Sequence, residues 1–392
     1  MKNRRVLFLF HDENRHNGAN RSMMDIIDYL AQNENIDPII VFPKKFGTAI
    51  DYATSKGYKV YRLRYGRWDF PDCISGIKKF RYLLKWLIKL FATIPASIFL
   101  CSKIKKKKID LIYTNTYTLF IGGWLKYITN KPLIWHIREF GKEDHNLKII
   151  CGDNVLYRYL NKFADRIIFI SKSVMDKYID HIDDKSKCSV LYNDISLENC
   201  DIISKWNFTN ESINILIAGT IQKGKGQLEA VKAIKCLNNT YSNKRCKLYI
   251  AGKKTGEYYE EILRYIENED LHDFVEFCGY IDDMKSLREK MHFGIVASTS
   301  EAFGRVTVEG MLQCMLMIGA NTAGTSELIL NEKTGYTYTL HNINELAATI
   351  NKCVDNLDKS EIVAKEGYNF AIDNFTKNKT SKEVAKLIRQ LC

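Results

Sequence analysis

Two glutamates stand eight residues apart in the segment 298–310, which reads STSEAFGRVTVEG: Glu301 and Glu309. The apolar residues before this segment predict a buried strand, and a helix is expected to begin near Val306, so the two carboxylates flank a helix N-terminus. Gly304 permits a sharp turn between them. Ionised carboxylates accept hydrogen bonds from vicinal hydroxyl groups, such as those of a sugar or a ribose. Each glutamate alone would be explained as a partner of the helix dipole, but the pair together favours a site for a hydroxyl-rich ligand.

A loop suited to phosphate precedes this segment in the chain. Residues 213–230 read INILIAGTIQKGKGQLEA, in which a predicted strand ends at Gly219 and a predicted helix begins near Gln227. The loop brings Lys225 and Gly226 to the helix N-terminus, where free N–H groups and the helix dipole favour an anion. The spacing matches neither a P-loop NTPase nor a nicotinamide-binding GxGxxG turn. An ordinary β–α turn with solvated lysines is the alternative interpretation of this loop when it is taken alone.

A third polar loop, from Asn321 to Glu327, follows the predicted strand 316–320. The carboxyl ends of parallel strands meet at one edge of a sheet, and α/β folds bind their ligands at that edge. We therefore expect the three loops to offer hydroxyl and anion contacts to one crevice.

The elements that must position these loops alternate between short apolar strands and helices along the whole chain. Most of the strands are continuous apolar runs, which is typical of a parallel sheet covered by helices on both faces. The alternation restarts after a polar stretch at 194–212, so we expect an α/β protein with two doubly wound, Rossmann-like domains that face a cleft. The expected domains are residues 1–195 and 196–370, followed by a C-terminal helix, 371–392, at their junction; the segment 361–392 is expected to be helical throughout. The expected strands are 5–10, 38–43, 58–63, 110–115, 132–137, 165–171 and 189–193 in the first half, and 213–219, 247–252, 275–280, 293–298 and 316–320 in the second.

The positive charge of the chain is concentrated in its first half. Fifty-eight basic and 46 acidic side chains give a formal net charge of +12, and residues 1–200 alone carry 34 basic and 21 acidic side chains. Residues 76–108 contain ten lysines and arginines and no acid. On a helical wheel Lys78, Arg81, Lys85 and Lys89 lie opposite an apolar face formed by Phe80, Leu83, Leu84, Leu87, Ile88 and Phe91. This pattern predicts a helix that lies on an anionic membrane surface, to which each basic residue contributes about 1 kcal/mol.

Two other interpretations of residues 76–108 remain open. An ordinary domain helix with solvated lysines explains any single charge well, and ten charges without an acid less well. Nucleic-acid binding would also use a basic segment, but no RNA- or DNA-binding motif is visible and we expect no nucleic-acid partner. Because Pro95 interrupts the apolar run, the segment is not expected to span a membrane.

The cysteines and the paired aspartates give no sign of a metal site. Eleven cysteines are scattered singly, without a CxxC pair or the Cys/His spacing of a zinc site. We interpret them as the reduced thiols of a cytoplasmic protein. The apolar run near the N-terminus is expected to be a buried strand, too short for a signal peptide. The pairs Asp183-Asp184 and Asp282-Asp283 are interpreted as loop or cap residues, so no metal is expected.

These motifs resemble those of the retaining, nucleotide-sugar-dependent glycosyltransferases of family four, which have the GT-B fold. The resemblance extends over essentially the whole chain and is most specific in the second half. There, the family patterns G-x5-KG, E-x7-E and G-x-x-E are matched by Gly219 to Lys225-Gly226, by Glu301 to Glu309, and by Gly324 to Glu327. In the first half, the segments that look like family segments are Gly18-Ala19-Asn20, which resembles the acceptor loop, WHIRE at 135–139, FISKSV at 169–174 and VLYND at 190–194.

The resemblance implies a role for each matching residue. Lys225 would bind the donor diphosphate, Glu301 would contact the transferred sugar, and Glu309 would hold the ribose hydroxyls. His136 would lie near the reacting carbon, so the expected catalytic residues are Glu301, Lys225 and His136. The other residues expected to line the donor site are Gly18, Gly219, Thr220, Gly226, Tyr280, Phe303, Gly304, Arg305 and Val306. Thr220 departs from the pattern because many relatives carry Arg there, so Lys223 or Arg305 would have to supply the second cation.

The resemblance also implies the reaction and its setting. A sugar would pass from a nucleoside-diphosphate sugar to a glycan or polyprenyl-linked acceptor, with retention and without a metal or other cofactor. The first domain would bind the acceptor and an anionic membrane through residues 76–108, and the second would bind the nucleotide sugar. We expect a cytoplasmic protein, peripherally attached to the inner face of the membrane, that acts in surface polysaccharide or glycolipid synthesis.

Two alternatives to the transferase remain open at this point. A nucleotide-sugar epimerase or a phosphorylase can share the scaffold, and a second isomer formed from the donor alone would favour the epimerase. A non-catalytic partner that brings a transferase to the membrane is the other alternative. Donor hydrolysis, or thermal stabilisation by a nucleoside diphosphate, would argue against that partner.

Overall fold

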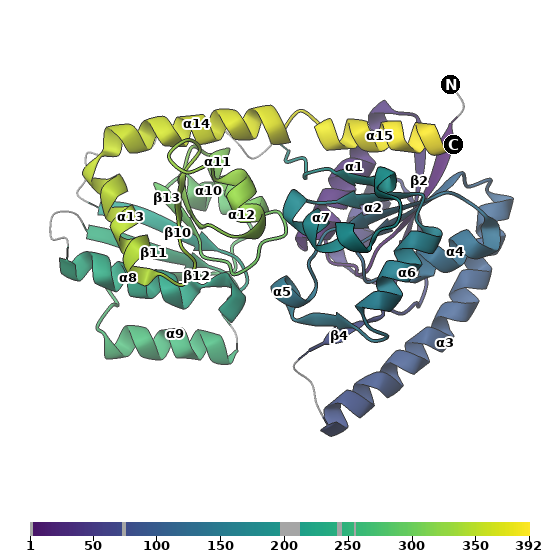
Figure 1. Ribbon diagram of the computed structural model, residues 1–392, viewed down its shortest axis with the longest axis horizontal. Helices are drawn as coiled ribbons and strands as arrows, with labels where there is room; N and C mark the ends of the chain where they lie inside the picture. Colours follow the sequence, from purple (N-terminus) through teal and green to yellow (C-terminus); the bar gives the residue numbers. More distant parts are fainter. Residues whose placement is uncertain (1–2, 73–75, 197–211, 241–244, 255) are drawn as a thin grey trace. The chain divides into compact units, whose positions relative to one another are not determined.

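The computed structural model describes residues 3–72, 76–196, 212–240, 245–254 and 256–392 (Figure 1). The chain forms two compact units. Unit 1 comprises Met1–Asp194 and Asn378–Cys392, and unit 2 comprises Ile195–Lys377.

Unit 1 is built on a parallel sheet of seven strands. From one edge to the other the strands are β3 (Lys59–Arg62), β2 (Ile36–Phe42), β1 (Arg4–Leu9), β5 (Leu111–Asn115), β6 (Leu133–Ile137), β8 (Arg166–Phe169) and β9 (Cys188–Val190). The described helices of this unit are α1 (Gly18–Asn33), α2 (Thr48–Ser55), α3 (Gly76–Lys106), α4 (Ile121–Thr129), α5 (Lys142–His145), α6 (Asp153–Phe163), α7 (Lys172–Tyr178) and α15 (Lys379–Leu391). Two short strands, β4 (Asp69–Pro71) and β7 (Leu147–Ile149), pair antiparallel outside the main sheet. The central strands are buried along their length, as expected of strands that helices cover on both faces.

Unit 2 repeats this architecture with six parallel strands. Their order is β12 (Val275–Gly279), β11 (Arg245–Ala251), β10 (Ser212–Ala218), β13 (Phe293–Val296), β14 (Leu316–Ala320) and β15 (Tyr336–Tyr338). The described helices are α8 (Gln227–Thr240), α9 (Glu257–Asn268), α10 (Met284–Arg288), α11 (Arg305–Met311), α12 (Ala323–Leu328), α13 (Ile343–Asp355) and α14 (Leu357–Phe375). The expected α/β class, with two Rossmann-like sheets, is therefore confirmed.

The C-terminal segment differs from its expected form. It is not helical throughout, because α14 ends at Phe375 and α15 begins at Lys379, with Asn378 in the left-handed region at φ 54° between them. Asp194 holds the start of α15, accepting hydrogen bonds from Ser381 N (2.8 Å) and Ser381 Oγ (2.8 Å). Helix α15 then packs against α1, burying Val384, Ala385 and Ile388 in the core of unit 1.

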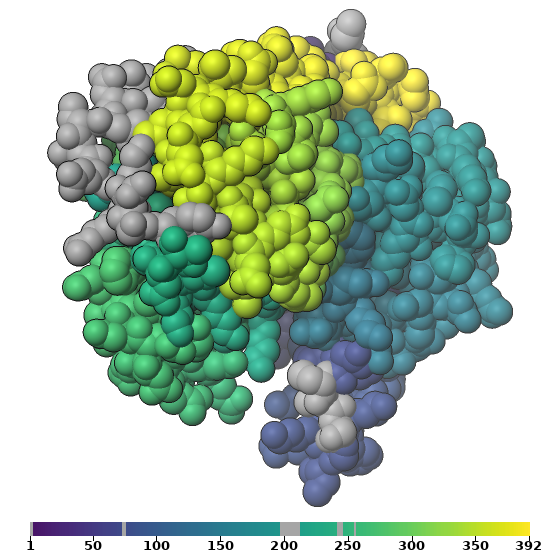
Figure 2. All heavy atoms as spheres, turned by 60° about the vertical axis from the view of Figure 1, so that its left-hand side comes forward, coloured from purple at the N-terminus to yellow at the C-terminus, as the bar shows by residue number. Residues whose placement is uncertain are grey.

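Helix α3 also differs from its expected form, because it continues through Pro95 as one helix of 31 residues. Its second half packs on α4 and buries Leu100 and Ile104, and the Thr93 hydroxyl accepts a hydrogen bond from Gly66 N (2.8 Å). The start of α3 stands clear of the rest of unit 1 (blue in Figure 2). Among the described residues, α3 is the one helix long and apolar enough to cross a membrane, although length and composition alone say no more than that. The expected interruption at Pro95 is thus wrong.

Candidate functional site

The candidate site lies in unit 2, where three neighbouring strands end in polar loops. Strand β10 lies between β11 and β13, so the strand order reverses there, and ligands of open α/β sheets bind at such a point. The loops that follow β10, β13 and β14 are the three singled out from the sequence.

The first loop leaves β10 through Gly219 and closes on the end of β13. Gly219 has φ 143° and Gly226 has φ 68°, backbone conformations that side chains disfavour. A Cβ on Gly226 would lie 2.4 Å from the carbonyl oxygen of Ala297, so only glycine permits this approach. Thr299 N donates to Gly224 O (3.0 Å), which fixes the loop against its neighbour.

Lys225 and Glu301 meet across these two loops. Lys225 Nζ lies 2.5 Å from Glu301 Oε1, and the Ser298 hydroxyl donates to the same oxygen at 3.2 Å. Both side chains are mostly buried, with exposed fractions of 24% for the lysine and 18% for the glutamate. A cation and an anion from loops 76 residues apart are therefore held at one place at the edge of the sheet.

Glu309 is held by two arginines. Arg288 Nη2 donates to Glu309 Oε2 at 2.5 Å, and Arg305 Nε donates to Oε1 at 3.2 Å. The three side chains are between 8% and 14% exposed. The two guanidinium groups fix the orientation of the carboxylate.

The third loop packs directly on the second. Gly324 N donates to Glu301 O at 2.8 Å, and a Cβ on Gly324 would lie 2.7 Å from that oxygen. The Thr322 hydroxyl donates to Ser298 O at 3.2 Å. The first and third loops therefore both fix the position of Glu301. Glu327 lies half-buried in α12.

The other residues predicted for the donor site divide into buried and exposed ones. Phe303 is buried, and its ring centroid lies 5.6 Å from that of Phe375, so this contact anchors the loop against α14. Gly304 precedes α11 with φ 90°, and Val306 is half-buried in that helix. Thr220 and Tyr280 are exposed, each just beyond a strand end.

His136 and Gly18 belong to unit 1. His136 lies within β6 with no exposed surface, and its Nδ1 accepts hydrogen bonds from the Tyr113 hydroxyl (2.8 Å) and Arg138 Nη2 (3.1 Å). Burial, and then Arg138, lower the pKa of His136 well below its ordinary value, so the ring is neutral. Contact between this ring and a sugar would require the side chains that cover it to move, and its catalytic role stays a prediction. Gly18 begins α1 and borders open space.

Two arginines are notable residues that the sequence analysis missed. Arg288 lies on a five-residue helix with no motif around it, and only its contact with Glu309 reveals it. Arg138, directly after β6, is buried and donates to Asn115 Oδ1 (2.5 Å) and Asn193 Oδ1 (2.8 Å). Arg138 lies within the segment WHIRE at 135–139, so the sequence did mark its position.

Glu139, the neighbour of Arg138, is a buried acid just after the end of β6. It is 8% exposed. Burial, and then the negative charge of Asp144, raise its pKa to about 8, against the opposing effect of Arg138 and Arg67.

One aspartate of each Asp-Asp pair caps a helix or a turn. Asp283 caps α10 by accepting from Ser286 N, and Asp184 accepts from Ser186 N in a short turn. Within the described residues, no group of three or more His, Cys, Asp or Glu side chains gathers as a metal site would require. The nine described cysteines form no disulfide with one another, and Cys73 and Cys200 lie outside the described residues.

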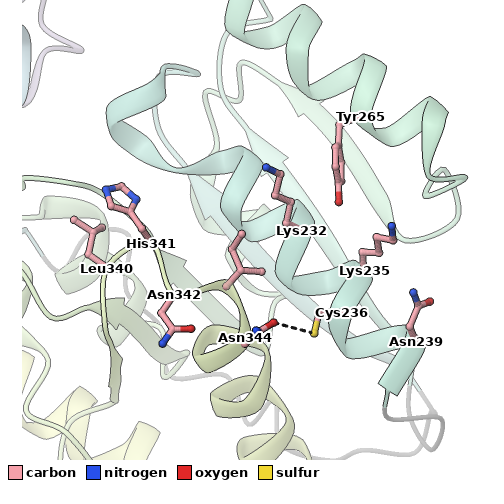
Figure 3. Close-up of a pocket in the computed structure, with 10 residues that line it drawn as sticks. Lys232, Lys235, Cys236, Asn239, Tyr265, Leu340, His341, Asn342 and Asn344 are labelled. Atoms are coloured by element: carbon pink, nitrogen blue, oxygen red, sulfur yellow. Dashed lines mark hydrogen bonds between the residues drawn. The ribbon is translucent and has the colours of Figure 1, made fainter.

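A cavity of unit 2 lies apart from this cluster. It measures about 660 Å³ and lies between α8, α9 and the start of α13 (Figure 3). Lys232, Lys235 and Tyr265 form one side, and His341 and Asn344 lie on the other. The side chains predicted for the donor site do not line it, so it has no part in the assignment below.

Helix α3 carries a second candidate surface. Eight large apolar side chains on it are between 42% and 80% exposed: Ile77, Phe80, Leu84, Leu87, Ile88, Phe91, Ile94 and Ile98. They recur every three or four residues and so form a stripe along the helix. Exposed apolar surface of this extent marks a contact with a membrane or another molecule.

Two family models match the chain. The model described as glycosyl transferases group 1 matches residues 200–370, and the model described as glycosyltransferase family 4 matches residues 16–199. The two matches adjoin and together cover most of the chain.

Several proteins named as glycosyltransferases are similar in sequence. An uncharacterized glycosyltransferase of Methanocaldococcus jannaschii, MJ1178, is 26% identical over 294 residues, or 74% of this chain and 77% of its own. The capsular polysaccharide biosynthesis glycosyltransferase CapM of Staphylococcus aureus is 22% identical over 71% of this chain and 76% of its own. A Campylobacter jejuni transferase, named as acting on an N-acetylgalactosamine-N,N'-diacetylbacillosaminyl-diphospho-undecaprenol, is 24% identical over 57% of this chain and 60% of its own.

Solved structures share the fold. The Anabaena protein Alr3699/HepE, crystallised in complex with UDP, is 20% identical and superimposes with a TM-score of 0.78 over 98% of this chain and 100% of its own. The apo lipopolysaccharide outer core galactosyltransferase WaaB is 16% identical, with a TM-score of 0.74 over 99% of this chain and 100% of its own.

Proposed function

The chain belongs to the family-four glycosyltransferases with the GT-B fold, and we propose that it moves a sugar from a nucleoside-diphosphate sugar to a glycan or lipid-linked acceptor in surface polysaccharide synthesis. The observation that carries the proposal is the meeting of Lys225 with Glu301, and of Glu309 with two arginines, on adjoining loops of unit 2. The names of similar proteins support the setting, because they include capsule and O-antigen biosynthesis.

The donor site follows from what each group can bind. Lys225 offers an ammonium group to the diphosphate, and Glu309 keeps oxygens oriented toward the ribose hydroxyls because its two arginines fix it. Glu301 forms an ion pair with Lys225. A diphosphate at Lys225 releases Glu301 to accept hydrogen bonds from the sugar hydroxyls.

The chemistry requires a positive group at the leaving phosphate. As the bond between the anomeric carbon and the diphosphate breaks, negative charge grows on the β-phosphate, and a fixed cation lowers the barrier. Lys225 supplies that charge in our proposal, without a divalent ion. Arg305, whose Nε donates to Glu309 Oε1 and whose side chain is 12% exposed, is the candidate for the second cation. Lys223 is the weaker candidate because its side chain is 80% exposed and lies 3.7 Å from Glu261.

We propose that the reaction retains the anomeric configuration, which rests on the family resemblance. Digestion of the product by anomer-specific glycosidases, or its anomeric coupling constant, tests this directly. Inversion would contradict the proposed stereochemistry but not the donor site.

The membrane contact is the second part of the proposal. The apolar stripe of α3 and the ten basic residues of 76–108 together match an anionic membrane surface. Such a protein would be peripheral, at the cytoplasmic face, with an acceptor whose lipid lies in the same membrane. Equal activity on a lipid-linked acceptor and on its soluble analogue, together with no binding to anionic vesicles, would overturn this part.

The experiment for the transferase itself is a screen of nucleotide sugars by thermal shift, followed by a transfer assay with the best binder. We expect one nucleotide sugar to raise the melting temperature and to donate its sugar to an acceptor. Conversion of the donor to an isomer without acceptor would indicate an epimerase instead. Absence of both binding and turnover for every donor would favour the non-catalytic partner.

A further inference from the structure

We propose that Glu139 of unit 1 binds a hydroxyl group of the acceptor sugar, through an uncharged carboxyl group that donates a hydrogen bond to it; this rests on the proposed function. The strand order of the unit 1 sheet reverses between β1 and β5. Ligands of open α/β sheets bind beside the carboxyl ends of the strands at such a point. Glu139 comes two residues after β6, the strand next to β5, so it lies at that edge of the sheet.

The neighbours of Glu139 place it close to the reversal of strand order. Asn115, the last residue of β5, accepts a hydrogen bond from Arg138 Nε at 2.5 Å, which joins the ends of β5 and β6. Arg67, just before β4, is within electrostatic range of both Glu139 and Asp12. Asp12 belongs to the loop that follows β1. The carboxyl group of Glu139 is therefore near the loops of the strands on both sides of the reversal.

This carboxyl group is buried, but one of its oxygens can be reached. Glu139 is 8% exposed, and its Oε2 accepts a hydrogen bond from Arg138 N at 3.3 Å. Among the described residues, Oε1 has no hydrogen-bond or ion-pair partner. It differs from fully buried unpaired oxygens, such as the Tyr117 hydroxyl, because it keeps accessible surface. A ligand that reaches Oε1 would satisfy a polar atom that is otherwise unsatisfied.

The surroundings keep the carboxyl group protonated at neutral pH. Burial, and then the negative charge of Asp144, raise the pKa of Glu139 to about 8, against the opposing effect of two arginines. Because Arg138 N already donates to Oε2, the proton belongs on Oε1, from which it can be donated to a ligand. Tyr117 and Tyr178 are also within electrostatic range, but burial raises the pKa of each phenol, so both stay neutral.

The charges of this region favour a neutral ligand. The charged side chains around Glu139 and Arg67 are three aspartates and two arginines: Asp12, Asp69, Asp144, Arg67 and Arg138. Lys177 of α7 also comes near, through its hydrogen bond to Phe140 O, but it pairs with Glu143 at 2.6 Å. An anionic group such as a phosphate would meet an excess of negative charge here. A sugar hydroxyl carries no charge and can accept the hydrogen bond that Oε1 donates.

The experiment measures binding of the methyl glycosides of glucose, galactose and N-acetylgalactosamine to the full chain by NMR titration at pH 7 and pH 9. Glu139→Gln keeps a neutral group that donates and accepts hydrogen bonds, whereas Glu139→Leu removes both functions. Glu143→Gln is the matched control, because Glu143 lies four residues away on α5 and its side chain is 47% exposed. Circular dichroism checks that each protein stays folded at both pH values.

We expect the unaltered protein to bind at least one glycoside, with a Kd that rises about tenfold from pH 7 to pH 9. The reason is that only about one carboxyl group in ten stays protonated one pH unit above its pKa. Glu139→Gln should bind equally well at both pH values, and Glu139→Leu should bind roughly three- to tenfold more weakly at pH 7. Glu143→Gln should behave as the unaltered protein does.

Three results would overturn the proposal: a glycoside Kd in the unaltered protein that does not change with pH, full affinity in Glu139→Leu, or no binding of any of the three glycosides. UDP binding to the unaltered protein is measured separately at pH 7. Its failure would refute the donor site rather than the role of Glu139.

Discussion

Replacing Lys225 with methionine tests the donor site most sharply among single substitutions. Methionine keeps most of the length and apolar volume of the lysine stem but removes the charge. Glu301 then keeps the Ser298 hydroxyl at 3.2 Å as a partner, and water can reach its carboxylate because 18% of that side chain is exposed. We therefore expect a folded protein.

The size of the effect follows from the geometry. A partly exposed ion pair such as Lys225–Glu301 contributes at most about 1 kcal/mol to stability, so the melting temperature should change by only a few degrees. A charge-assisted hydrogen bond to a diphosphate contributes about 1.5–3 kcal/mol, so the Kd for UDP should rise by roughly 10- to 150-fold. Because charge grows on the phosphate in the transition state, kcat should fall further, by roughly 100- to 1,000-fold.

Lys223→Met is the matched control for this substitution. Lys223 lies two residues away in the same loop, is 80% exposed, and is 3.7 Å from Glu261. We expect less than a twofold change in either constant, measured by calorimetry with UDP and by product formation. If Lys225→Met binds UDP and transfers sugar as the unaltered protein does, or if Lys223→Met has the larger effect, the reasoning about the loop is refuted.

Three further changes test other parts of the account. Arg288→Met should cost about 3 kcal/mol of stability, because it leaves Glu309 without one of its two arginines. It should also reduce the preference for UDP over its 2′,3′-dideoxy analogue. An unchanged preference would show that Glu309 does not bind the ribose hydroxyls. The raised pKa of Glu139 means that the unfolded chain loses this proton near pH 4.5 and the folded protein near pH 8, so stability should fall as pH rises through this window. Glu139→Gln should remove that fall. The unfolding free energy that the variant gains over the unaltered protein should be larger at pH 8 than at pH 4 by roughly 2–4 kcal/mol. Parallel pH–stability curves for the two proteins would contradict this. Ile88→Ser with Phe91→Ser should weaken sedimentation with phosphatidylglycerol vesicles at least tenfold, whereas Ile128→Ser, which removes an equally exposed side chain from α4, should not.

The strands that are buried along their whole length were all predicted from the sequence. Strands such as β5 and β14 are continuous apolar runs, and a hydrophobic pattern of that kind has few other structural explanations. The strands it missed, β4, β7 and β15, are three residues long, too short to establish a period. Strands β4 and β7 pair with each other from distant parts of the chain, which no local pattern reveals.

The two helices that departed from expectation show how context overrides a local signal. Pro95 stays inside α3, although proline removes a helix hydrogen bond, while the neighbouring Thr93 hydroxyl donates to Lys89 O and accepts from Gly66. The break after α14 has neither proline nor glycine to mark it, and depends on Asn378 in the left-handed region and on Asp194 from elsewhere in the chain.

In the candidate site, the sequence identified the loops but not the contacts within them. Lys225, Glu301 and Glu309 were recognisable because glycines and strand ends surround them. That Lys225 pairs with Glu301 depends on the neighbouring positions of β10 and β13, which is a property of the sheet. Arg288 was invisible for the same reason, since its side chain acquires a role only when α10 and α11 are brought together.

The most direct test of the central claim is a crystal structure of the protein with a nucleoside diphosphate bound. The account predicts the β-phosphate within hydrogen-bond distance of Lys225 Nζ, the ribose hydroxyls on Glu309, and Glu301 released from the lysine. A nucleotide bound instead in the cavity between α8, α9 and the start of α13 would contradict it. So would an ordered diphosphate beside a Lys225–Glu301 ion pair that stays intact.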